Sequence, residues 1–291
     1  MMLIFHFVWN DTSNSGSRFK RLCMSVLFQA YKRLPFAKPF HVHLISGLKY
    51  IVNPNVPNST GIIYSKVYES NAIEIARAVL SARHSGIIID VGAHTGLYSL
   101  QIADLSSKII LIEPSKDTAR VLQENISINP HLNAEIHQVA LGDCIGKATL
   151  YKQQKFDGMA TLKSLNGVKK GETVDVVTLD SIIFEKTISF LKIDCEGAEL
   201  EVIKGAKDIL KANSEILLHI EITEKFKEVC KVLNDQNFLI YYRTISGKLD
   251  LVENEITAHN KNPTFYDTPA RGDFWAVKKN ANHIISVLSK S

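Results

Sequence analysis

Asp90 and two glycines form a turn whose spacing matches neither of the common phosphate-binding motifs. Asp90 ends the apolar run at 87–90, and Gly92 and Gly96 follow, with His94 between them. A dinucleotide turn requires another glycine at position 94, and a P-loop requires a Gly-Lys-Ser/Thr ending. A strand-end acid repels a pyrophosphate but suits a cationic, hydroxyl-rich ligand. S-adenosylmethionine fits, because it has an ammonium, a sulfonium and a ribose diol but no phosphate.

A second acid, Glu113, ends the next apolar run, "KIILIE", and lies 21 residues after Gly92. In nucleotide-binding sheets an acid at about this distance from the glycine turn accepts hydrogen bonds from the two ribose hydroxyls. We therefore predict that Glu113 binds the ribose of the cofactor.

Further acids follow two later apolar runs, "FLKID" and "LLHIEI". Alternation along a strand puts Lys192 and Asp194 on one side, and Glu221 ends the neighbouring strand. A carboxylate at the end of a central strand is costly unless it is used or paired, and Lys192 is the expected partner of Asp194. Glu196 and Glu199 lie where a helix begins, a place that favours acids whatever the function, so Glu199 is interpreted as structural.

Methyl transfer to a hydroxyl needs alignment of the reacting atoms and a base for the proton. The hypothesis is that Asp194, with Glu196 or Glu221, orients and deprotonates the hydroxyl, while Lys192 pairs with Asp194 or helps to bind the acceptor. Two alternatives stay open. The three acids can hold Mg²⁺ instead, or His94 can be the base, although His94, together with Gly92 and Gly96, is predicted to contact the cofactor or to have a structural role in the turn.

The elements that must position these residues alternate between apolar runs and helical stretches. Near-continuous apolar runs are typical of parallel strands buried on both faces, and their order predicts a doubly wound α/β sheet with ligands at the carboxyl ends of the strands. Residues 144–182 break the alternation and predict a β excursion after the third strand. Residues 238–279 predict a final antiparallel pair. The predicted strands are "GIIIDVG", "KIILIEP", "AEIHQVALGD", "FLKIDCEG" and "EILLHIEIT".

The blocks "IIIDVGAHTGLYSL", "IEP", "VALGD", "VVTLDSI" and "LKIDCEGAELEVIKGA", in this order, resemble the FkbM-type methyltransferases that use S-adenosylmethionine. The resemblance implies a Rossmann-like class I methyltransferase fold with a reversed last strand, and O-methylation of a sugar, glycan or natural-product-like small molecule. It also implies that Ala140 and Asp143 contact the cofactor and that Glu221 is the strand-end acid of the family. The family usually has Asn where this chain has His94.

The expected organisation has four parts: an N-terminal helical segment at 1–39, a hairpin and helix at 40–86, the methyltransferase domain at 87–279 and a tail at 280–291. The acceptor pocket is expected between the N-terminal segment and two loops, "FDGMATL" and "NPTFYDTPARGD". These segments have the least pattern, so the acceptor itself is not predicted.

Charge and cysteine content narrow the function classes. The net charge of +4 is spread along the chain without a long basic block, which disfavours a nucleic-acid binder, including an RNA ribose methyltransferase. The four cysteines are far apart and form no CxxC pair, so no zinc site or disulfide framework is predicted, and a reducing cytoplasm is expected. The missing glycine at position 94 disfavours a nicotinamide-dependent oxidoreductase.

Residues 18–36 combine basic ends with an apolar middle and lack the length of a membrane span. The favoured interpretation is a terminal helix docked on the domain, and the alternative is peripheral contact with an anionic membrane. The alternative function is accordingly a non-catalytic domain of the same fold, targeted to a membrane or a complex by this helix.

Overall fold

The computed structural model describes most of the chain, and the statements below concern those residues. They are 5, 8–9, 11–14, 16–54, 60–83, 86–152, 160–161, 171–185, 187–222, 224–244, 248–252 and 272–289. Most of the two loops that were expected to line the acceptor pocket lies outside them.

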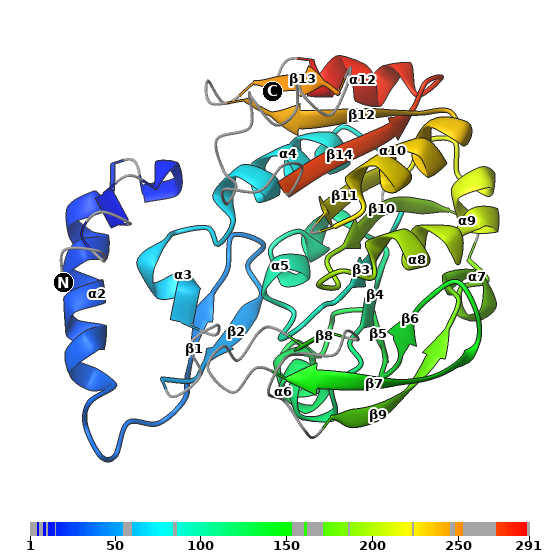
Figure 1. Ribbon diagram of the computed structural model, residues 1–291. Coiled ribbons are helices and arrows are strands. Elements are labelled where there is room, and N and C mark those ends of the chain that lie inside the picture. The colour runs from blue at the N-terminus through cyan, green and yellow to red at the C-terminus, as the bar shows by residue number, and fades with distance from the viewer. Residues whose placement is uncertain are drawn as a thin grey trace.

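A central mixed sheet has the strand order β13-β12-β14-β11-β10-β3-β4-β5 (Figure 1). The strands β3, β4, β5, β10 and β11 pair in parallel, whereas β14 runs antiparallel to β11 and to β12. The predicted doubly wound sheet with a reversed last strand is therefore confirmed. The strands are β3 (Ile87–Val91), β4 (Lys108–Ile112), β5 (Ala134–His137), β10 (Ile188–Ile193), β11 (Leu217–Ile222), β12 (Phe238–Arg243), β13 (Leu249–Leu251) and β14 (Gly272–Lys278).

Helices cover both faces of this sheet, which explains why its strands are apolar without alternation. In β3, Ile87, Ile89 and Val91 pack into the core beneath α8, α9 and α10, whereas Ile88 packs into the opposite core with α4 and α12. The helices are α4 (Ser70–Ser81), α5 (Leu97–Leu100), η3 (Ala103–Leu105), α6 (Lys116–Ser127), α7 (Leu179–Ile182), α8 (Glu199–Lys204), α9 (Lys207–Ala212), α10 (Phe226–Asp235) and α12 (Asn282–Leu288).

The β excursion after the third strand is confirmed as a separate sheet with the order β6-β9-β7-β8. The run "AEIHQVALGD" differs from its prediction as one strand, because β6 leaves the central sheet and pairs with β9. The strands of this sheet are β6 (Ala140–Leu141), β7 (Gly146–Lys152), β8 (Ala160–Thr161) and β9 (Glu172–Val177).

Three helical segments also differ from their predictions. The stretch after the glycine turn forms only the short α5 and η3, and the stretch after β10 divides into α8 and α9 at Gly205. A Cβ on Gly205 would lie 2.0 Å from the Gly142 carbonyl oxygen, so the helix breaks where two backbones touch. The expected tail contains α12, whose Ile284 and Leu288 are buried in the core that also contains α4 residues.

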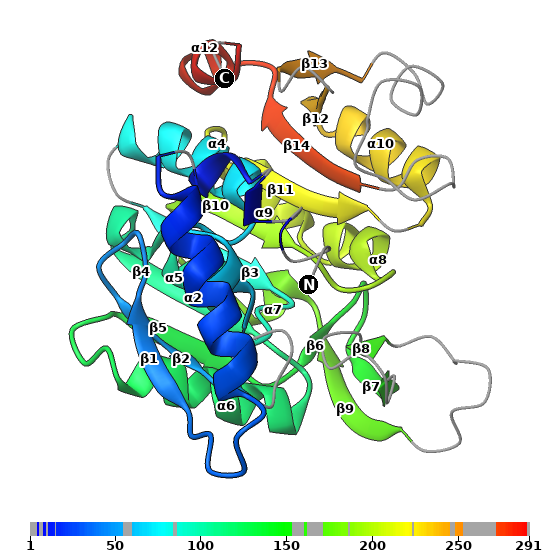
Figure 2. The same cartoon turned by 90° about the vertical axis from the view of Figure 1, so that its left-hand side faces the viewer.

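The N-terminal segment forms a helix and the predicted hairpin, which pack beside the central sheet (Figures 1 and 2). The backbone of β2 donates hydrogen bonds from Lys49 and Ile51 to Asn129 and Asn125, which fixes the hairpin to α6 and the turn after it. Within the described residues no helix is long and apolar enough to cross a membrane. The elements are η1 (Thr12–Asn14), α2 (Arg18–Tyr31), β1 (Phe40–His43), β2 (Lys49–Val52) and α3 (Gly61–Tyr64).

Gly92 joins the ends of β3 and β10. Its φ is +79°, and a Cβ at this position would lie 1.8 Å from the carbonyl oxygen of Asp194. The amide of Asp194 in turn donates to the Val91 carbonyl at 3.0 Å. The glycine turn and the acid after β10 are therefore held together by direct backbone contact.

Gly92→Ala is expected to destabilise the fold by roughly 1–3 kcal/mol from the left-handed backbone alone, and by more because the Asp194 carbonyl must move. Thermal unfolding of the purified variant measures this loss. Gly146→Ala is the matched control, because no atom lies within 4 Å of a Cβ placed there. Equal melting temperatures for the two variants would contradict the close contact.

Candidate active site

Lys192 lies at the centre of a charged cluster at the carboxyl ends of β3 and β10. Its Nζ atom is 2.7 Å from Asp194 Oδ2 and 3.9 Å from Asp90 Oδ1. It also lies 5.1 Å from the centre of the Tyr98 ring. Burial alone would lower the pKa of Lys192, but the charges of Asp194, Asp90 and Glu69 outweigh it and hold that pKa well above its usual value. The predicted pairing of Lys192 with Asp194 is present.

Asp194 is the accessible member of this cluster. Its side chain is 26% exposed, against 6% for Lys192 and 1% for Asp90. Burial raises the pKa of Asp90, and Lys192 and a 2.5 Å hydrogen bond from Ser99 partly oppose that shift. Of the two carboxylates nearest to Lys192, Asp194 is therefore the one exposed to solvent, whereas Asp90 is buried.

Two more carboxylates complete the acidic wall of the site. Asp194 is the largest cause of the raised pKa of Glu221, and burial and Asp273 add to it. Glu69, just before α4, is exposed, and its charge acts on both Asp194 and Lys192. Sequence reasoning identified Glu221 but missed Glu69 and Asp273. The only signal for Glu69 was its place in "VYES", directly before a helix.

A chain of hydrogen bonds crosses the sheet beside the cluster. The Tyr98 hydroxyl is 3.0 Å from His219 Nδ1, and His219 Nε2 is 3.2 Å from Asp273 Oδ1. A carboxylate only accepts, so Nε2 carries the proton in the neutral ring and Nδ1 accepts from Tyr98. Trp275 stacks on the imidazole at 4.2 Å between ring centres. Burial would raise the pKa of Asp273, but His219 outweighs it and lowers that pKa.

Glu113 links the two strand-end turns. Its Oε2 accepts from the His94 amide at 3.0 Å, and its Oε1 accepts from the Ser115 amide at 2.9 Å. These two bonds hold the carboxylate at the turn where the ribose contact is predicted. The expected ribose contact is compatible with this geometry and stays a prediction.

His94 has a left-handed backbone, with φ of 50°. Asn and His are among the few side chains that are enriched in this conformation. The exchange of the family's usual Asn for His94 therefore keeps the backbone requirement of the turn, whatever the imidazole does. Glu196 has a similar φ of 51°, directly before Gly197. Its catalytic role stays a prediction.

Glu199 has a structural contact, in agreement with its interpretation above. Its Oε1 accepts from the Gly197 amide at 2.7 Å, so the carboxylate satisfies backbone just before α8.

In the small sheet, Ala140 is buried in β6, and Asp143 is exposed in the turn that follows. Their contacts with the cofactor stay predictions.

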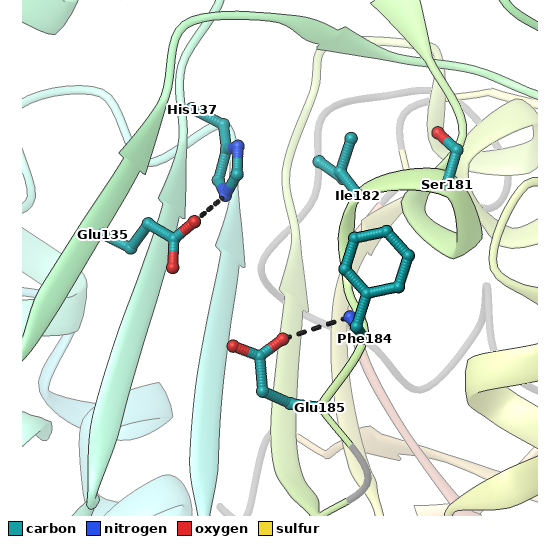
Figure 3. A pocket seen from close by; sticks show the side chains of 6 residues that line it. All are labelled: Glu135, His137, Ser181, Ile182, Phe184 and Glu185. Carbon is teal, nitrogen blue, oxygen red and sulfur yellow. Dashed lines mark hydrogen bonds and ion pairs between the residues drawn. The ribbon is translucent and has the colours of Figure 1, made fainter.

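A separate pocket of about 500 Å³ lies between β5 and the segment after α7 (Figure 3). Glu135 and His137 line one side of it, and Phe184 and Glu185 line the other. Both carboxylates are ion-paired with Lys108 at 2.6 Å. Both acids are thus already ion-paired, and the pocket does not include the strand-end cluster. Among the described residues no group of three or more His, Cys, Asp and Glu side chains has an arrangement that holds a metal ion.

Residues 90–240 match the profile of the Methyltransferase FkbM domain, which covers the glycine turn, Lys192, Asp194 and β11, whereas Glu69 and Asp273 lie outside the match. The chain belongs to the FkbM methyltransferase family. It is a methyltransferase that uses S-adenosylmethionine, as the resemblance of its motifs implied.

Relatives of this FkbM methyltransferase are distant. Methyltransferase 1 of Beauveria bassiana (strain ARSEF 2860) is 24% identical over 191 residues, which are 57% of this chain and 75% of the relative. Hexuronic acid methyltransferase AglP of Haloferax volcanii is 23% identical over 171 residues, which are 56% of this chain and 67% of the relative. The solved structure of P. horikoshii TYW2 with MeSAdo is 14% identical, with a TM-score of 0.45, and covers 83% of this chain and 72% of that one. A likeness at that level adds nothing to the topology described above.

The turn of this FkbM methyltransferase fits the cofactor chemically. Asp90 Oδ1 is buried and has no hydrogen-bond partner in the described part of the chain, although Lys192 lies 3.9 Å away. An unsatisfied buried carboxylate oxygen is costly, and a cationic or hydroxyl donor removes that cost. Asp90 and Glu113 therefore match the donors that S-adenosylmethionine presents.

Glu113→Ala is expected to weaken binding of S-adenosylmethionine about ten- to a hundredfold, because charged hydrogen bonds contribute roughly 1.5–3 kcal/mol. Isothermal calorimetry measures the affinity. Since Glu113 also holds two backbone amides, thermal unfolding of the same sample must show that the variant is folded at the assay temperature. Unchanged affinity in the folded variant would remove Glu113 from the cofactor site.

Glu221→Gln tests the proximity of Glu221 to Asp194. The raised pKa of Glu221 means that the folded chain keeps a proton that the unfolded chain releases, so stability is lost as the pH rises from the ordinary carboxyl pKa to the raised one. Gln does not titrate. The melting temperature of the variant minus that of the wild type should therefore increase as the pH rises from about 5 to about 8.5.

The matched control for this comparison is Glu228→Gln, an exposed acid on α10. Its melting temperature relative to the wild type should stay constant over the same pH range. A melting-temperature difference between Glu221→Gln and the wild type that also stays constant with pH would show that the charge of Asp194 does not act on Glu221.

Proposed function

We propose that this methyltransferase transfers the methyl group to a hydroxyl oxygen of a sugar, a glycan or a natural-product-like small molecule, with Asp194 as the base. The observation that carries the proposal is the pair formed by Asp194 and Lys192. Lys192 Nζ donates to Asp194 Oδ2 at 2.7 Å, and this contact orients the other oxygen of Asp194, Oδ1. The Asp194 side chain is 26% exposed. An oriented and accessible carboxylate is what removal of a hydroxyl proton requires.

S-adenosylmethionine, when bound, supplies an activated methyl group at its sulfonium. The contribution of this chain is alignment and proton removal. Asp194 accepts the hydroxyl proton as the acceptor oxygen forms its new bond to carbon, a role typically worth about 10²–10⁴ in rate. Glu221, or Glu196 from the following turn, is proposed to bind another hydroxyl of the acceptor and to fix its orientation.

The charges around Lys192 support a neutral acceptor. Among the described residues, five carboxyl groups, Asp90, Asp194, Glu69, Glu221 and Asp273, interact with one lysine, Lys192, and the charges of Asp194 and Asp273 already raise the pKa of Glu221. A carboxylated acceptor would add a further negative charge to this group, and like charges repel. One relative is named for a hexuronic acid, and we propose that this chain prefers uncharged hydroxyl compounds instead.

The proposed setting is the reducing cytoplasm. The four cysteines are free thiols, and Cys23 and Cys144 are exposed. Exposed thiols persist in a compartment that keeps them reduced. No nucleic-acid partner is proposed, because the residues around Lys192 are acidic and a phosphate backbone needs basic contacts.

Asp194→Asn tests the proposed base. With a panel of neutral and carboxylated sugar acceptors, the wild type should release S-adenosylhomocysteine most rapidly with neutral ones. The variant should lose about 10²–10⁴ in kcat while its affinity for S-adenosylmethionine changes little. Asp208→Asn, an exposed acid on α9, is the matched control and should keep full turnover.

Two results would overturn the proposal. Full turnover in Asp194→Asn with cofactor binding intact would remove Asp194 as the base. Absence of S-adenosylhomocysteine release with any hydroxyl acceptor, in a protein that binds S-adenosylmethionine, would favour the non-catalytic alternative.

A further inference from the structure

The N-terminal part of the chain is basic and contains no acid over a long stretch. Residues 12–68 contain no Asp or Glu and eight basic residues, whereas the whole chain has a net charge of only +4. The remainder of the chain is therefore net negative. The eight basic residues are Arg18, Lys20, Arg21, Lys32, Arg33, Lys38, Lys49 and Lys66.

One face of α2 is docked on the domain. Phe28 is buried among the side chains of α3 and the hairpin, and Ser25 is buried on the same face. Gln29 donates to the Tyr64 hydroxyl at 2.6 Å, and Arg21 donates to the Ile62 carbonyl at 3.3 Å. The favoured interpretation of this helix as docked therefore agrees with the structure for that face.

The opposite face of α2 is exposed and apolar. Phe19 is 75% exposed and Leu27 is 69% exposed. An amphipathic helix docked on a soluble core normally turns polar residues outward, which this face does not do. Its exposed members recur at helical spacing and continue beyond the helix end; we call them the outer stripe. They are Phe19, Cys23, Val26, Leu27, Ala30 and Leu34.

Exposed basic residues flank the outer stripe. Lys20 lies beside Phe19, Arg33 lies beside Leu34, and Lys38 follows in the turn before β1. An apolar face bordered by Lys and Arg is the pattern of a helix that lies in the interface of an anionic bilayer. A second copy of the chain would bring two acid-free basic segments together, so like-charge repulsion disfavours that occupant.

We propose that α2 docks by its outer stripe on an anionic lipid surface, with Phe19 and Leu27 inserted among the acyl chains and Lys20 and Arg33 at the headgroups. The helix lies on the side of the domain toward which the carboxyl ends of β3, β10 and β11 point (Figures 1 and 2). Docking would therefore hold the carboxyl ends of these strands on the side of the enzyme that faces the bilayer. The proposal does not depend on the identity of the acceptor.

Flotation of the full-length protein with vesicles tests this docking. The chain should float with vesicles of phosphatidylcholine and phosphatidylserine and stay behind with phosphatidylcholine alone, and high salt should reduce the bound fraction. Lys20→Gln combined with Arg33→Gln should weaken partitioning about thirtyfold, since each basic residue at an anionic surface contributes roughly five- to sixfold. Phe19→Asp combined with Leu27→Asp should abolish it.

Phe184→Asp is the matched control, because Phe184 is 81% exposed and lies near α7, away from the outer stripe. It should float like the wild type, and all variants should keep the wild-type melting temperature because the replaced side chains are exposed. Failure of the wild type to float with anionic vesicles would overturn the proposal. An equal loss of flotation in Phe184→Asp would also overturn the proposal. Light scattering could instead show a dimer that Leu27→Asp dissociates. That result would also overturn the proposal, since the outer stripe would then contact a second copy of the chain.

Discussion

The ion pair between Lys192 and the carboxylates of Asp194 and Asp90 is the interaction on which the site depends. A lysine that is only 6% exposed costs several kcal/mol unless partners compensate it. The strand register supplies these partners, because Lys192 pairs across the sheet with Asp90 on β3 and with His219 on β11. His219 in turn pairs with Trp275 on β14. A row of polar and aromatic side chains thus crosses four strands of an otherwise apolar sheet.

Because the row is built from strand register, the glycine turn and the acids around Lys192 move together with the ends of β3 and β10. Gly92 lets the turn after β3 touch the backbone of Asp194, and the Asp194 amide bonds to Val91. A displacement of either strand end would therefore move both sites together. This coupling suits a methyl transfer, in which donor and acceptor atoms must be held in line.

Backbone conformation at the site is unusual in a consistent way. Glu69, His94 and Glu196 all have left-handed backbones, and each lies next to the strand-end cluster or in the cofactor turn. Such conformations cost energy and persist where the surrounding structure holds them. The charges of the chain are also segregated, since acids gather at the strand ends and basic residues gather in the N-terminal segment.

The sequence by itself determined the parallel sheet, the β excursion, the reversed last strand and the residues at the strand ends, because these depend on local patterns of apolar runs, glycines and acids. The pairing of Lys192 with Asp194 also followed from alternation along one strand. Only the tertiary structure brought Glu69 and Asp273 to the cluster, since their neighbours are more than a hundred residues away or on other strands. The tertiary structure likewise decided which face of α2 is buried. The helix has apolar side chains on two faces, and its sequence alone does not show which of them packs against the domain.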